Sequence, residues 1–291
     1  MESALALCRF AHFLSAMALF GVTLYVRALA PPDLAHVLAP AARRVAAVTI
    51  PVAALSAVAW IALEAASMAD SWSGLVDVDI LQGVLTDTAF GAVWRWRLAI
   101  ALALLVALAL RRQGPSTFMT IVSALLLASL CLVGHASMQH DGVGALHRAN
   151  HALHLLTTAA WLGGLPVFAL CLKAYRDPAL RRDAVSAMRR FSFWGQFDVA
   201  LVVLTGAVNV ALTSGASPFP PPTPYRALLC AKIALVATMI ALALVNRYVL
   251  APRLKPDAPA LRILMRTSLA EVALGVGVVA LVSEFALLDP F

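Results

Sequence analysis

Charged residues are scarce in this sequence, at 13% of 291 positions, which is about half of the share in soluble domains. Apolar residues make up 62%, and the mean hydropathy is +0.87. A soluble domain of this composition would have too few polar side chains to cover its surface. The long apolar runs predict an all-α integral membrane protein, because helices satisfy all of their backbone hydrogen bonds within lipid.

Cysteine is also rare, with four residues that all fall inside apolar runs and show no CxxC spacing. Neither a disulfide framework nor a zinc ribbon is therefore expected. The sequence has no GxxxxGK[ST] motif, which argues against ATP-driven transport. The net charge of +7 comes from short basic clusters between apolar runs. That pattern is typical of a membrane protein and argues against nucleic acid as a partner.

Eight apolar runs approach the length of about 20 residues that a transmembrane helix needs. We place the spans at 5–27, 45–67, 93–110, 117–137, 148–172, 191–213, 226–249 and 266–288. Together they predict one polytopic membrane domain over residues 1–291, in contact with lipid. Cleavage of a signal peptide after Ala30 is the alternative for the first run, but Arg9 interrupts that run.

The basic residues predict the orientation. The connections after the first, third, fifth and seventh spans hold 16 of the 22 lysines and arginines. Basic loops stay in the cytoplasm, so both termini are expected in the periplasm of a bacterium, with the chain in the inner membrane.

An internal duplication relates the two halves of the chain, residues 1–140 and 141–291. The aligned pairs run in the same direction through the membrane and are His12 with His154, Gly21 with Gly163, and Arg97 with Lys232. A parallel four-plus-four repeat explains their common order, and some transporters are built from such repeats. Chance similarity between apolar helices is the alternative.

Six of the seven histidines fall on the predicted periplasmic side. Three of them are spaced i, i+4 and i+7, and therefore share one helix face. Imidazole is a common metal ligand, and sulfur ligands add softness that suits Cu(I). The predicted metal ligands are His12, His135, His151 and His154, with Met17, Cys131, Met138, His140 and His147 as candidate neighbours. For His140 or His147 alone, hydrogen bonding at the membrane interface is the simpler role.

Eight charged or amide side chains also fall inside the spans, where such groups are costly and mark pairing or function. They are Glu64, Arg97, Asp198, Asn209, Lys232, Asn246, Glu271 and Glu284. We predict that Glu64 pairs with Arg97 and that Glu284 pairs with Lys232. The other four residues are expected nearer the cytoplasm. They indicate either a second binding site for a transported ion or hydrogen bonds between helices.

A series of short motifs resembles a known family. In order, the motifs are Gly134-His135-Ala136, His151 and His154, Trp161 to Leu165, Arg190-Phe191-Ser192, Thr205-Gly206 with Asn209, Tyr225 with Lys232, and Asn246-Arg247. Their order and spacing are similar to those of the CopD family of bacterial copper-resistance membrane proteins, also called PcoD. The resemblance implies an eight-helix inner-membrane protein that moves copper into the cytoplasm, supplied by a small periplasmic CopC-like carrier. The family's histidines carry over to His135, His151 and His154, and less directly to His12.

The leading hypothesis is a copper homeostasis or resistance protein that binds copper and moves it without catalytic turnover. A ligand shell of histidine and sulfur would favour Cu(I), whereas an all-histidine shell could also hold Cu(II). One alternative is a haem-b electron-transfer protein or metal reductase, in which His12 faces His135 or His151. Another is a copper-delivery or assembly factor that transports nothing.

Overall fold

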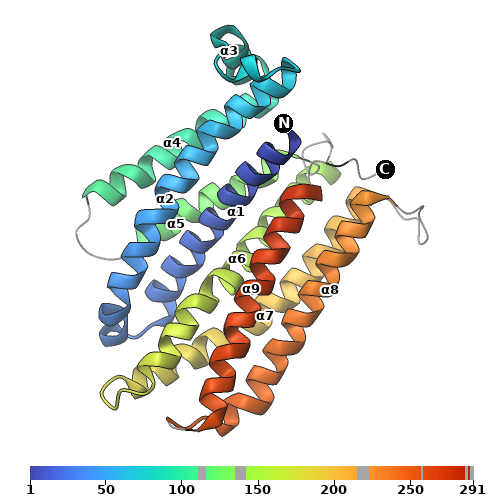
Figure 1. Ribbon diagram of the computed structural model, residues 1–291. Helices are drawn as coiled ribbons and strands as arrows, with labels where there is room; N and C mark the ends of the chain where they lie inside the picture. Colours follow the sequence, from blue (N-terminus) through green and yellow to red (C-terminus); the bar gives the residue numbers. More distant parts are fainter. Residues whose placement is uncertain (111–115, 135–141, 215–222, 257, 286–287, 289–291) are drawn as a thin grey trace.

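In a computed structural model, the chain forms a bundle of long helices (Figure 1). The structure describes residues 1–110, 116–134, 142–214, 223–256, 258–285 and 288, and these residues contain no β-strand. The first half contains α1 (Glu2–Leu24), η1 (Tyr25–Leu29), α2 (Pro32–Met68), η2 (Trp72–Leu75), α3 (Val78–Asp87), α4 (Ala89–Leu110), α5 (Thr117–Ala128) and η3 (Ser129–Leu132). The second half contains α6 (Gly142–Ala174), α7 (Arg181–Ser214), α8 (Pro224–Val245), η5 (Asn246–Leu250), η6 (Ala251–Arg253) and α9 (Pro259–Phe285).

Seven helical segments of the described chain are long and apolar enough to cross a membrane. They coincide with seven of the eight predicted spans. The fourth predicted span falls on α5 and η3, a shorter apolar helix over Thr117–Leu132. The last residues of that prediction, 135–137, lie outside the described residues.

Several helices begin well before the predicted spans. The helix α2 begins at Pro32, so that Arg43 and Arg44, predicted in a loop, lie within a helix. Proline is favoured in the first helical turn because it has no N–H to leave unsatisfied there. Hydropathy marks the part of a helix that lipid surrounds, whereas backbone hydrogen bonding continues beyond it.

The acidic connection after α2 forms a short helix, α3, which packs against α2 and α4 at one end of the bundle (Figure 1). Asp77 caps this helix, because its carboxylate accepts hydrogen bonds from the backbone N–H groups of Asp79 and Ile80 at 3.1 and 3.2 Å. The beginning of α1 and the end of α9 lie near the same end of the bundle (Figure 1).

Helices α1 and α6 form the centre of the bundle and pack against each other. They cross where Gly21 faces Gly163. A Cβ added to Gly163 would lie 2.5 Å from the carbonyl oxygen of Met17, and a Cβ on Gly21 would collide with the carbonyl of Ala159. The contact is therefore made backbone to backbone, as is common where small residues meet in membrane helices.

The two halves differ in how tightly their outer helices close. In the first half, α2 packs against both α1 and α4. In the second half, α7 packs extensively against α6, and α8 against α9, but the described parts of α7 and α8 share no extensive interface. One cavity lies between the two halves, toward one end of the bundle, and a second lies within the second half, toward the other end.

Candidate functional site

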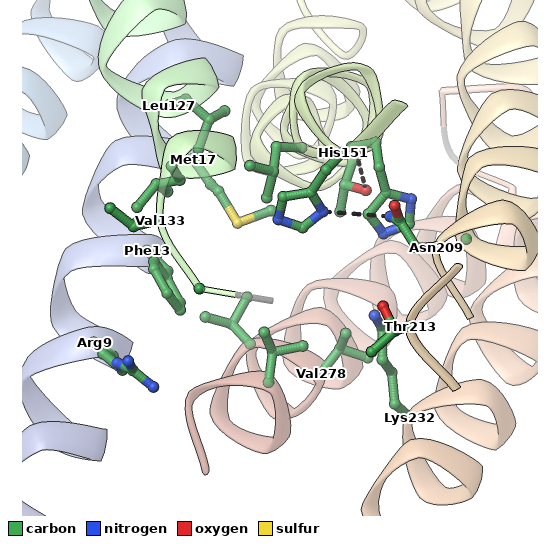
Figure 2. A pocket seen from close by; sticks show the side chains of 18 of the residues that line it. Arg9, Phe13, Met17, Leu127, Val133, His151, Asn209, Thr213, Lys232 and Val278 are labelled. Atoms are coloured by element: carbon green, nitrogen blue, oxygen red, sulfur yellow. Dashed lines mark hydrogen bonds between the residues drawn. The ribbon is translucent and has the colours of Figure 1, made fainter. Parts of the chain in front are cut away.

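The first cavity lies toward the end of the bundle where α1 begins, and we call it the histidine cavity. Its volume is about 350 Å³. Most of its wall is apolar, and its polar lining consists of Arg9, Glu64, His147, His151, His154, Thr158, Asn209, Thr213, Tyr225 and Lys232. Figure 2 shows the side chain of His151 entering from one side and Lys232 on the opposite side. Pockets of this kind, apolar with a few convergent polar groups, are typical ligand sites.

His154 is the histidine whose protonation the structure defines best. Its Nδ1 lies 2.9 Å from the Oγ1 of Thr205 on α7. The Thr205 hydroxyl donates its one proton to the carbonyl of Leu201 at 2.5 Å, so Nδ1 of His154 must donate to Thr205. The lone pair of this neutral imidazole is then on Nε2. A metal ligand needs such a lone pair, and an outer hydrogen bond that fixes the ring is the usual support for one.

His151 lies one turn before His154 on α6 and also lines the cavity. The two rings are nearly parallel, with planes 13° apart and centroids 6.5 Å apart. The amide of Asn209 on α7 lies 3.3 Å from Nδ1 of His151 (Figure 2). Its oxygen also accepts a hydrogen bond from the side chain of Asn150 at 2.8 Å. Met17 of α1 points its thioether sulfur into the same cavity (Figure 2). Together with His147, three imidazoles and one sulfur therefore line one space.

His12 lies outside this cavity, in a sealed cluster of the first half. Its ring is 0% exposed, and Nδ1 lies 3.0 Å from the Oγ of Ser56 on α2. The Ser56 hydroxyl donates to the carbonyl of Val52 at 2.6 Å, so here too Nδ1 is the donor. The guanidinium of Arg97 contacts Nε2. Both ring nitrogens of His12 therefore have protein partners. Because His12 does not line the cavity that His151 lines, the structure does not bring the two together as a shared copper or haem site requires.

The predicted ion pair between Glu64 and Arg97 is wrong. Arg97, which is 0% exposed, donates to the carbonyl of Leu126 at 3.0 Å and to Ser129 at 2.5 Å, besides contacting His12. Its guanidinium also lies 4.7 Å above the ring of Trp94. These neutral partners stabilise the buried charge by hydrogen bonds and a cation–π contact.

The two predicted acidic partners lie elsewhere. Glu64 accepts a hydrogen bond from the indole of Trp60 at 3.0 Å and lines the histidine cavity together with Arg9. Glu284 is exposed near the end of α9, and the structure does not bring it to Lys232, which lines the cavity. The sequence shows which helix carries each charged residue. Which residues meet depends on how each helix is rotated about its axis, and that is visible only in the structure.

The remaining predicted neighbours are only partly described. His135, Met138 and His140 lie outside the described residues, whereas Gly134 lines the cavity. His147 is buried in the cavity wall, and its Nδ1 has no hydrogen-bond partner within the part of the chain that the structure describes. Cys131 is buried on η3 and is not part of the lining. Within the described ranges, no three His, Cys, Asp or Glu side chains are grouped to hold a metal ion together.

The other embedded polar residues divide between the two ends of the bundle. Asn246 and Glu271 line the second cavity, at the opposite end of α8 and α9 from the histidines. Asp198 is half-buried on α7 and lines neither of the two cavities. Of the four residues predicted to form a second binding site, the structure thus brings together two.

Sequence reasoning assigned no role to the hydroxyls that orient the histidines. Ser56 and Thr205 each sit on the helix following a histidine helix, in an apolar stretch. The one available signal was a hydroxyl side chain in an apolar span, which is common in membrane helices and therefore weak.

Comparison with known proteins places the chain among copper-resistance proteins. Residues 1–147 match the family described as "Copper resistance protein D-like, N-terminal domain", and residues 185–284 match "Copper resistance protein D". No solved structure gives a significant match.

Three curated proteins are similar to the chain. The inner membrane protein YebZ of Escherichia coli (strain K12) is 36% identical over 97% of both chains. Copper resistance protein D of Pseudomonas syringae pv. tomato is 30% identical, over 87% of this chain and 84% of its own length. The copper transport protein CutJ of Bacillus subtilis (strain 168) is 28% identical, over 50% of this chain and 28% of its own.

Proposed function

Since the chain belongs to the copper resistance protein D family and is a multi-pass inner-membrane protein, we propose that it binds copper in the histidine cavity and moves it into the cytoplasm. The observation that supports this most directly is the Nε2 lone pair of His154, oriented by Thr205 within a cavity inside the bundle. The proposed activity is binding and passage of an ion, without catalytic turnover.

The donors around the cavity favour a soft ion. Imidazole nitrogens from His151 and His154, with the thioether of Met17, form a set that suits Cu(I) better than a hard cation. Lys232 lines the other side, and its positive charge opposes the retention of a cation. Conduction requires binding strong enough to admit an ion and weak enough to release it, and this arrangement fits that need.

We further propose that copper arrives from the periplasm, supplied by a CopC-like carrier. The support is the distribution of basic residues, which gather in the connections at the end of the bundle away from the histidine cavity. Both termini and the mouth of the cavity are then periplasmic.

We also propose that the chain is a parallel repeat of two four-helix halves, with α5 as the eighth, shorter span. Equivalent residues make equivalent contacts: Gly21 faces Gly163 across α1 and α6, as expected of a two-fold relation. In each half a histidine, His12 or His154, donates from Nδ1 to a hydroxyl of the next helix. The Arg97 guanidinium then fills the place that an ion would take in the first half.

Copper uptake into proteoliposomes tests the transport function. Vesicles containing the purified protein are expected to accumulate copper above protein-free vesicles, and His154→Ala vesicles are not. Vesicles with the exposed His36→Ala variant serve as the control and should match the unmodified protein. Copper that is retained by the protein in detergent but never accumulates would contradict transport and favour a delivery or assembly role.

The first-half histidine provides a separate prediction. His12→Phe is expected to destabilise the protein without reducing copper retention. The substitution leaves the Arg97 guanidinium short of an acceptor, and an unsatisfied buried polar group costs about 1–3 kcal/mol, more when it is charged. Thermal unfolding in detergent and copper content per protein measure the two effects. Loss of copper at unchanged thermal stability would show instead that His12 is a ligand.

A further inference from the structure

The second cavity lies toward the opposite end of the bundle, and we call it the glutamate cavity. It has a volume of about 710 Å³ and lies between α6, α7, α8 with η5, and α9. Glu271 of α9 lines it, although this side chain is only 2% exposed. An acidic group buried within a membrane span is costly unless a proton, an ion or a partner neutralises it.

A short chain of hydrogen bonds fixes one side of this carboxylate. The hydroxyl of Thr267 lies 2.5 Å from Oδ1 of Asn246, and the amide nitrogen of Asn246 faces Glu271. That nitrogen donates to Oε1 of Glu271 at 2.5 Å. Among the described residues, this amide is the only hydrogen-bond partner of the carboxylate, which leaves the second oxygen for a ligand.

Ser268 supplies a second and independent sign of a ligand. It lies one turn before Glu271 on α9, so both side chains are on the same face of that helix. It is 1% exposed and lines the glutamate cavity, yet its hydroxyl has no hydrogen-bond partner among the described residues. Buried hydroxyls nearly always have a partner, so a missing ligand is the direct explanation.

Of the charged groups that the structure describes around the cavity, none forms a direct ion pair with Glu271. Arg189 of α7 and Arg247 of η5 both line the cavity, as do the phenols of Tyr175 and Tyr248. Arg247 donates instead to the hydroxyl and carbonyl of Ser192, with the hydroxyl at 2.8 Å. The guanidinium groups of Arg189 and Arg247 thus lie in the cavity wall, and the second carboxylate oxygen of Glu271 is left to bind a cation from outside the protein.

We propose that Glu271 and Ser268 bind a hard monovalent cation, either a proton on the carboxylate or Na⁺, which acts as the coupling ion of copper transport, while Asn246 holds the carboxylate in place. The site offers a carboxylate oxygen and a hydroxyl oxygen, which bind hard cations and suit Cu(I) poorly. It is thus chemically distinct from the histidine cavity. The inference rests on the proposed transport function.

The positions of the two cavities fit such coupling. Thr158 of α6 lines the histidine cavity, and Trp161, one turn further along, lines the glutamate cavity. The layer between them is packed closely, because Leu162 of α6 fills the space over Gly275 of α9, where a Cβ would collide with it. A small movement of α9 against α6 would therefore affect both cavities.

Infrared difference spectroscopy of the purified protein tests the site without requiring transport. The C=O band of a protonated carboxylic acid is expected to change with pH or with added NaCl, and to be absent from Glu271→Gln. A change with NaCl at constant pH, with KCl as the salt control, identifies Na⁺, and a change with pH alone identifies a proton. Asp198→Asn, which removes a half-buried acid outside both cavities, is the matched control and should keep the band.

A second variant guards against misfolding of Glu271→Gln. Ser268→Ala removes only the unpartnered hydroxyl and is expected to shift the band and its ion dependence without abolishing it. An unchanged band in both variants would overturn the site. Copper content of the same samples separates the two proposals. Normal copper retention with an unchanged band refutes only the coupling site, whereas no copper retention by the unmodified protein refutes the proposed function.

Discussion

Replacing both His151 and His154 with alanine is expected to abolish copper retention by the purified protein while leaving membrane insertion intact. The double variant loses two of the three imidazoles that line the histidine cavity and keeps only His147 and the Met17 thioether as metal donors. Removing even an outer-shell partner of a metal ligand weakens binding by about 10–100-fold, so the loss of both ligands should exceed that range. Copper per protein after gel filtration measures it.

Two further variants sharpen this result. Thr205→Val keeps the shape of the side chain but removes the hydroxyl that orients His154, and it should weaken copper binding by about tenfold. His36→Ala, an exposed histidine far from the cavity in sequence, should retain copper normally. Unchanged copper stoichiometry in the double variant would exclude the histidine cavity as the copper site.

Replacing Gly163 with valine is expected to prevent α1 and α6 from packing, with loss of most of the folded, monodisperse protein. The first carbon of any side chain would lie 2.5 Å from the carbonyl oxygen of Met17, so the two central helices would have to separate. Overpacking a well-packed core costs about 1–3 kcal/mol, and here the obstacle is backbone that cannot change rotamer. Size-exclusion profiles and thermal unfolding in detergent measure the effect.

Alanine substitutions provide the matched comparison for this prediction. Gly163→Ala places a single Cβ in the α1–α6 contact, whereas Gly195→Ala on α7 places one where no atom lies within 4 Å. Both substitutions raise helix propensity by a similar amount. Only the first should lower the unfolding temperature. Equal unfolding temperatures would show that the α1–α6 contact does not limit stability.

The helices themselves followed closely from the sequence. Lipid requires long apolar helices, so the apolar runs identified seven spans that the structure also gives. The ends of the helices could not be predicted from hydropathy. The helix α2, for example, begins at Pro32 and includes Arg43 and Arg44, which were predicted to lie in a loop. Hydropathy reports the surroundings of a helix, and a helix stops where its hydrogen bonding stops.

The candidate site was predicted in part. The spacing of His151 and His154 placed both on one face of α6, because helix geometry fixes which residues share a face. Met17 was chosen from the sequence as a sulfur neighbour and lines the same cavity. The predicted partner of Arg97 was wrong, because Glu64 lines the histidine cavity, whereas Arg97 binds Leu126, Ser129 and His12.

The sequence by itself determined that this chain is a helical membrane protein, which helix carries the histidines, and where the basic connections lie. Only the tertiary structure decided that His12 is sealed against Arg97 while His154 faces a cavity. The physical reason is that these two histidines have similar local sequences and similar hydroxyl partners. What differs between them is the packing of the surrounding helices, which is close around α2 and α4 and open between α7 and α8.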